Sequence, residues 1–437
     1  MTKLATNIFI TVLFLFVCHE SIDVWMFNTG DFDRAITPFM QGIAQFSTDD
    51  VLIYPMRDSF NHILSYDYKS SFSFILYGYA YIISFFTHSF DLRIWASLSK
   101  LIYILFLYML FKEIIKKRIF ILFFPFLIIP LITPSILSQF TAFYQEQIVI
   151  TLIPLILVML IKEKRSNFDF IIMVSATAII ATAKSQFFYV PILVSFCEFI
   201  FKKNSNIKLH LSLLLSLLIA ISFSVFSPSA TKVNSYHSLY FGTLLYNKIN
   251  HKQNPSWADE KCIGIDAWGN EFDLDKGAIS TQIGESCYNS TADHGLKDSL
   301  ILILKNPVIL LKLPFDTGIK SQLSEDYFHV FKSIKLINSK GGWLIKVQEV
   351  KDMLLKDLRI PLSFFLMIVS LVLYKKRYAT SLFFLSSLSL SQFYISFLGE
   401  GYRDLNKHLF TMNYSFDLII FISLCMVIKF LFGHVRR

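Results

Sequence analysis

The stretch "IWASLSKLIYILFLYMLFKEIIKKR", residues 94–118, decides the fold class, because a long apolar run ends there in a cluster of basic residues. An apolar helix of about 17–25 residues can cross the hydrocarbon core of a bilayer, and the run 94–111 has that length. Lys112 and the KKR sequence at 116–118 follow directly. Because Lys and Arg are enriched in cytoplasmic loops, the stretch predicts a membrane-spanning helix that ends at the cytoplasmic face.

The composition of the whole chain excludes a soluble globular protein. Of the 437 residues, 54% are hydrophobic and 16% aromatic, and the mean hydropathy is +0.53. Charged residues make up only 17%, against about 25% in typical soluble domains. The net charge of +9 is concentrated in short basic clusters between apolar blocks, as in cytoplasmic loops, and not in a nucleic-acid-binding surface. We therefore predict an all-α polytopic membrane protein with no nucleic-acid partner.

The basic clusters set the predicted topology. Placing them all in the cytoplasm gives about ten transmembrane helices and puts both termini inside. The first apolar segment resembles a secretory signal but lacks a small-x-small cleavage site, so we predict that it is retained. A crossing at 71–86 would move the cluster at 112–118 outside, so we predict an interfacial or re-entrant helix there, with an eleventh span as the alternative. The predicted spans are 5–24, 94–111, 119–139, 148–162, 168–183, 186–201, 209–227, 358–374, 379–398 and 409–432.

This topology divides the chain into three parts. Residues 1–227 form an N-terminal membrane domain with spans one to seven and a first outer loop at 25–93. Residues 228–357 form a large hydrophilic outer loop between spans seven and eight. Residues 358–437 form a C-terminal membrane domain with spans eight to ten. In the large loop, Cys262 and Cys287 fit a disulfide in an oxidising compartment, with two free thiols as the alternative.

Unusual polar side chains gather on the outer face. The first outer loop carries "NTGDFDRAI", two short outer turns carry "FYQEQ" and "AKSQ", and the last outer turn is "GEGYRDLNKH". Carboxylates beside basic groups suit a reaction with an anionic leaving group such as phosphate, which Arg and Lys bind strongly. One carboxylate then suffices as a general base, because a phosphate leaving group needs little protonation, and direct displacement inverts the anomeric centre. The candidate residues are Asp31, Asp33, Arg34, Glu146, Lys184, Arg403, Lys407 and His408.

Other chemistries have no comparable motif. The chain contains no GxSxG, Walker, HExxH or CxxC pattern. His237, His251, His294 and His329 lack metal-ligand spacing, so we predict solvated loop histidines, no metal and no cofactor. A weakly bound divalent ion at Asp31 and Asp33 stays open as an alternative.

The outer motifs resemble those of a known family. "NTGDFDRAI" is similar to the acidic first-loop motif of the GT-C polyprenyl-phosphate-dependent glycosyltransferases, and more narrowly the chain resembles the O-antigen glucosyltransferases of serotype-converting bacteriophages. "FYQEQ", "AKSQFFYVP", "YHSLYFGTL" and "GEGYRDLNKHLFTMNYSFDL" follow in the family's order. The likeness covers most of the chain and implies a GT-C-like fold.

The resemblance implies a serotype-converting activity at the periplasmic face of the bacterial inner membrane. Glucose would pass from undecaprenyl phosphate glucose to a lipid-linked O-antigen repeat of the lipopolysaccharide, and the partners would be a companion donor synthase and a flippase. The family's first-loop acid falls on Asp31, with Asp33 next. Because the family's "DE" is "DFD" here, the choice of base stays open. Glu146 matches the acidic turn and Lys184 the hairpin lysine.

Two other function classes compete with this prediction. A lipid-linked sugar flippase predicts charges within the spans and pseudo-symmetric halves, whereas here Asp417 is the main charge within a span. An O-antigen polymerase or ligase predicts reliance on outer-loop Arg and His without an acid after span one. For such a protein Asp31→Asn would be nearly harmless.

Overall fold

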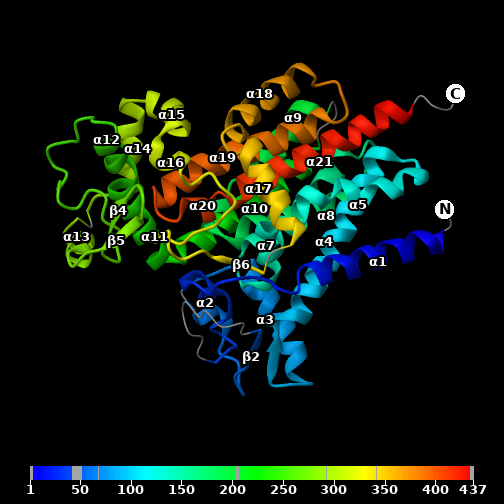
Figure 1. The fold of residues 1–437 in the computed structure, drawn as a ribbon, viewed down its shortest axis with the longest axis horizontal. Helices are drawn as coiled ribbons and strands as arrows, with labels where there is room; N and C mark the ends of the chain where they lie inside the picture. The colour runs from blue at the N-terminus through cyan, green and yellow to red at the C-terminus, as the bar shows by residue number, and fades with distance from the viewer. Residues whose placement is uncertain are drawn as a thin grey trace.

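The computed structural model describes residues 3–41, 52–66, 68–202, 206–291, 293–340 and 342–433. The chain is mostly helical, and its few strands form three two-stranded sheets. Figure 1 shows the start of α1 and the end of α21 on one side of the molecule and α12, α13 and α14 on the opposite side. These two helix ends therefore lie away from the part of the large loop that contains α12, α13 and α14.

The prediction of a polytopic membrane protein is supported by the helices, although the number of spans is not confirmed. In the described part of the chain four helices are long and apolar enough to cross a membrane, or five when one bent pair is counted. The other apolar helices are shorter; α9 has 12 residues, about 18 Å at 1.5 Å per residue. The helices in the predicted spans are α1 (Lys3–Glu20), α4 (Leu92–Ile115), α7 (Glu146–Ile161), α8 (Asn167–Ala183), α9 (Val190–Phe201), α10 (Ile207–Val225), α18 (Arg359–Val372), α19 (Ala379–Glu400) and α21 (Phe410–Gly433).

The prediction of one continuous span at 119–139 is wrong. Pro125, Pro130 and Pro134 interrupt it, because proline lacks an amide hydrogen and clashes with the preceding helical turn. The chain then bends by 115° before α7, which begins at Glu146. The bend leaves a short non-helical stretch between Thr141 and α7, and it places the Glu146 carboxylate at the first residue of α7, which is a buried helix. The pieces are η2 (Arg118–Phe123), α5 (Phe124–Leu127), η3 (Ile129–Leu131), α6 (Pro134–Leu137) and η4 (Ser138–Thr141).

Two small sheets locate the first outer loop. β1 (Val24–Met26) pairs with β6 (Ile337–Ser339), so the first loop and the large loop lie on the same face of the molecule. β2 (Ile53–Pro55) pairs with β3 (Ser89–Asp91), which returns the chain beside its earlier position after α3 (Ser71–Ser84). The 14 residues of α3 span about 21 Å, less than the ~30 Å hydrocarbon core. Because α18, in a predicted span, also has 14 residues, this length does not distinguish an interfacial helix at 71–86 from an eleventh span, and both stay predictions.

The large loop is a folded unit with its own hydrophobic core. Its buried residues pack against the outer end of α19 and against α20 (Leu405–His408). Cys262 and Cys287 form a disulfide, as predicted, and closing this loop of 25 residues contributes about 3 kcal/mol. The other elements are α11 (Pro228–Tyr236), the π-helix η6 (His237–Thr243), α12 (Leu244–Ile249), β4 (Asn270–Asp273), β5 (Gly277–Ser280), α13 (Gly284–Ser290), α14 (Leu296–Lys305), α15 (Val308–Lys312), η7 (Leu313–Phe315), α16 (Thr317–Lys320) and α17 (Trp343–Leu355); outside the loop lie α2 (Gly30–Ile36), η1 (Ile63–Ser65) and η5 (Ser185–Phe187).

Candidate functional site

A buried ion pair joins two of the predicted motifs. Glu146 begins α7, and Lys184 follows the last residue of α8. The Lys184 Nζ atom lies 2.7 Å from Glu146 Oε1, and the two side chains are 10% and 5% exposed. Since an isolated buried charge is costly, the two opposite charges compensate each other at this depth. The structure thus brings together two residues that the sequence marked separately.

The last outer turn meets the same place. The Lys407 ammonium lies 5.4 Å from the centre of the Tyr144 ring, and its positive charge acts on the Glu146 carboxylate. The Gln186 amide donates to the His408 carbonyl oxygen at 2.9 Å, which fastens the lysine hairpin to α20. Lys184 and Lys407 therefore both act on one carboxylate, that of Glu146.

The first outer loop packs against the same turn through α2. The Tyr144 hydroxyl lies 2.7 Å from the Thr29 hydroxyl and accepts from the Thr29 amide at 3.2 Å. The Phe32 ring lies edge-on to the Phe143 ring, with centroids 4.7 Å apart. Thr29 precedes α2, so these contacts fix the helix that carries the DFD sequence beside Glu146.

Asp33 occupies a half-buried position on α2. Burial raises the pKa of the Tyr54 phenol to about 12, and the nearby negative charge of Asp33 adds to this effect. Asp33 therefore stands at a partly desolvated place beside an aromatic ring. The backbone of Asp31 belongs to α2, but its side chain lies outside the described residues, so the prediction for Asp31 is not addressed by the structure.

A cavity lined by basic residues opens beside these motifs, and we call it the basic cavity. Tyr68, Lys69 and Lys184 contribute to its walls. The Arg34 guanidinium lies 5.5 Å from the centre of the Tyr68 ring, at the edge of the cavity. Cationic side chains around a small cavity can bind an anion such as a phosphate group.

The sequence predicts that Arg403 and His408 bind the donor phosphate. In the structure, both side chains interact with acidic residues of the protein. The Arg403 guanidinium lies 3.1 Å from Asp266 and 4.1 Å from the centre of the Trp268 ring. Arg403 is therefore held by two residues of the large loop, Asp266 and Trp268. The charge of His408 acts on Glu400, at the end of α19.

His237 is a buried residue that the sequence reading mistook for a solvated histidine. Its side chain is fully buried, and Nδ1 lies 2.9 Å from Glu400 Oε2. Nε2 accepts the Ala267 amide at 3.0 Å, so both ring nitrogens are held by the protein. His237 belongs to the π-helix in "YHSLYFGTL", and such helices are often found at functional sites.

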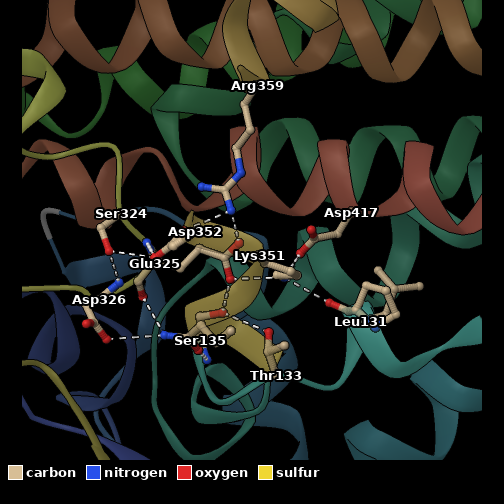
Figure 2. Close-up of polar contacts among 12 residues, drawn as sticks. Leu131, Thr133, Ser135, Ser324, Glu325, Asp326, Lys351, Asp352, Arg359 and Asp417 are labelled. Carbon is tan, nitrogen blue, oxygen red and sulfur yellow. Dashed lines mark hydrogen bonds and ion pairs between the residues drawn. The ribbon is translucent and has the colours of Figure 1, made fainter. Parts of the chain in front are cut away.

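A second polar cluster lies beneath the large loop and was also missed from the sequence. Figure 2 shows Lys351 between Glu325 and Asp417, with Arg359 reaching toward Glu325 and Asp352. Lys351 lies 3.1 Å from Glu325 and 2.5 Å from Asp417. Because these residues come from the loop after α16 and from α17, α18 and α21, the network joins the large loop to the membrane helices. No local signal marks it, since its members are far apart in the sequence.

The acid sensitivity of the fold gives a test of the packing around His329. Burial lowers the pKa of His329 below its ordinary value of 6.5; Asp404 opposes this shift, and Arg403 and Lys407 add to it. The neutral ring is favoured in the folded state, so its stability contribution is present above pH 6.5 and falls by up to about 1.4 kcal/mol per pH unit below that. We expect His329→Gln to flatten the decline of the melting temperature between pH 7 and pH 5. An equal slope in both proteins would contradict this prediction.

In the described ranges no group of three or more His, Cys, Asp or Glu side chains is placed to hold a metal ion. The polar residues gathered at Tyr144 and Glu146 offer the Glu146–Lys184 ion pair, a second lysine, Lys407, and a nearby aspartate, Asp33. This set can bind a phosphate and accept a proton.

Comparison with known proteins identifies a related chain. Residues 320–437 match the family described as "YfdI N-terminal transmembrane domain". A protein of Escherichia coli (strain K12) described as "Uncharacterized protein YfdI" is 38% identical over 416 residues, which are 95% of this chain and 94% of that protein. No solved structure matches the chain.

Proposed function

Because the chain belongs to the YfdI family of membrane proteins, we propose that it is a hexosyltransferase that uses a polyprenyl-phosphate sugar as donor. Glucose would pass from undecaprenyl phosphate glucose to a lipid-linked O-antigen repeat. The observation that carries this proposal is the convergence at Tyr144 and Glu146 of four motifs from separate parts of the chain: α2, the turn before α7, the lysine hairpin and the last outer turn.

In the proposed mechanism the basic side chains bind the donor phosphate. Lys69 and Lys184 line the basic cavity. Lys407, in α20, lies close enough to Glu146 for its charge to act on that carboxylate. Glu146 acts on the reaction through Lys184, since the ion pair holds the lysine in place. Asp33 accepts the proton of the acceptor hydroxyl as general base. Direct attack on the anomeric carbon releases the lipid phosphate and inverts the configuration.

We further propose that the protein lies in the bacterial inner membrane with ten crossings and with its termini in the cytoplasm, the crossing at 119–139 being made by short helical pieces in place of one continuous helix. Shared β-pairing of the first and large loops supports one common face for the reaction. The start of α1 and the end of α21 lie away from that face (Figure 1). A donor synthase and a flippase would deliver the sugar, and no cofactor is needed for this displacement.

Mass spectrometry of O-antigen repeats tests the proposal. A bacterium that expresses the chain together with a donor synthase and a flippase should gain one hexose per repeat. The control is the same strain without the chain. An unchanged repeat mass with altered polymer length would instead indicate a polymerase or ligase, and altered surface export would indicate a flippase; either result would overturn the proposal.

A further inference from the structure

A large groove adjoins the basic cavity on the side of the large loop. It has a volume of about 930 Å³, within the range of roughly 300–1,000 Å³ typical of ligand pockets. One wall is apolar and comes from the membrane helices, with Phe188, Ile221 and Leu398. The opposite wall comes from the large loop, with Tyr288, Asn289 and His294. The groove therefore has an apolar wall on the side of the membrane helices and a more polar wall on the side of the large loop.

The groove and the basic cavity adjoin each other. Both are lined by Ser185, Ser224, Thr231 and Asn234. Lys184, which forms the ion pair with Glu146, lines the basic cavity and is next to Ser185 in the chain, so the groove lies next to the ion pair. A ligand bound here can thus present one of its groups to the proposed reaction centre.

The loop wall of the groove is held in shape by packing and by the disulfide. Tyr288 follows Cys287, which is bonded to Cys262, and its ring lies edge-on to the Tyr236 ring at 5.5 Å. The His294 ring stacks on the Trp257 ring with centroids 4.3 Å apart. A wall that is ordered before binding reduces the entropy lost when a ligand binds.

We propose that this groove binds the acceptor saccharide, with its lipid carrier against the apolar wall. Amide, hydroxyl and imidazole groups pair with sugar hydroxyls as both donors and acceptors, and aromatic rings cover the apolar faces of a sugar. The basic cavity, at about 30 Å³, has room for no more than a phosphate-sized anion, so a saccharide must lie in the groove. The larger groove suits an oligosaccharide. This inference rests on the proposed function for the identity of the reaction.

The test compares the kinetics of groove variants in purified full-length protein. The donor is a synthetic polyprenyl-phosphate hexose, and the acceptor is O-polysaccharide released by mild acid from lipopolysaccharide. Asn289→Trp would fill the groove, and Asn289→Ala would remove its amide. Since losing a subsite costs at least one hydrogen bond, we expect the KM for the acceptor to rise about tenfold or more, with the KM for the donor and kcat unchanged. Tyr374→Ala, an exposed tyrosine outside the groove, is the matched control.

Each outcome decides between the two proposals. An unchanged KM for the acceptor in both Asn289 variants, or a rise only in the KM for the donor, would overturn the acceptor site. If the wild-type protein transfers no hexose either to this acceptor or to a lipid-linked O-antigen repeat, the proposed function fails, and binding of the same polysaccharide is then read by saturation-transfer NMR. Binding that is lost in Asn289→Trp would still support a saccharide site, whereas no binding by the wild type would overturn it.

Discussion

Replacing Asp33 by asparagine is expected to lower the rate of hexose transfer by about 10²–10⁴-fold, the usual effect of losing a general base. Asparagine keeps the size of the side chain but cannot accept the proton of the acceptor hydroxyl. Asp33 is half-buried on α2. The residue before α2, Thr29, contacts Tyr144, in the turn that leads to Glu146 and its partner Lys184. The measurement is the initial rate of transfer by purified protein at saturating donor and acceptor.

Two further variants make this result specific. Asp58→Asn changes an exposed aspartate of the same outer loop and should keep the wild-type rate. Asp31→Asn is measured in parallel, because the DFD sequence offers two carboxylates. If Asp33→Asn keeps full activity while Asp31→Asn loses it, the base is Asp31; if both keep it, the mechanism with a first-loop base is wrong.

Replacing Glu325 by glutamine is expected to destabilise the fold by about 1.5–3 kcal/mol, the usual contribution of a hydrogen bond to a charged group, because Lys351 keeps Asp417 and Arg359 keeps Asp352 as a partner. Glu325 is 1% exposed and pairs with both Lys351 and Arg359. Burial alone would raise the pKa of Glu325, but the two positive charges outweigh it and hold the pKa below its ordinary value. Ser135 also donates a hydrogen bond to the carboxylate at 2.8 Å.

Thermal unfolding in detergent, followed by size-exclusion chromatography with fluorescence detection, measures this loss. Glu349→Gln removes an exposed carboxylate of α17 and should melt like the wild type. Removing Lys351 together with Glu325, as Lys351→Met and Glu325→Gln, should cost less than the sum of the single changes, since each single change already removes the contact between these two residues. A Glu325→Gln protein that melts with the control would show that the network adds no stability.

The positions of most apolar helices could be predicted from the sequence, because hydropathy is a local property. Every predicted span except 119–139 coincides with a helix. The exception also carried a sequence signal, since three prolines within ten residues of Pro125–Pro134 do not permit a continuous helix. The disulfide was predictable as well, because Cys262 and Cys287 are the two cysteines of the large loop.

The sequence by itself thus determined a helical membrane protein whose polar motifs lie outside its apolar helices. Only the tertiary structure decided which polar groups meet. Glu146 and Lys184 are 38 residues apart, and Lys351 and Asp417 are 66 residues apart. Such pairs form where two helix faces come into contact, and that contact depends on bends and crossing angles that hydropathy does not encode. The buried charges were therefore visible in the sequence, but their partners were not.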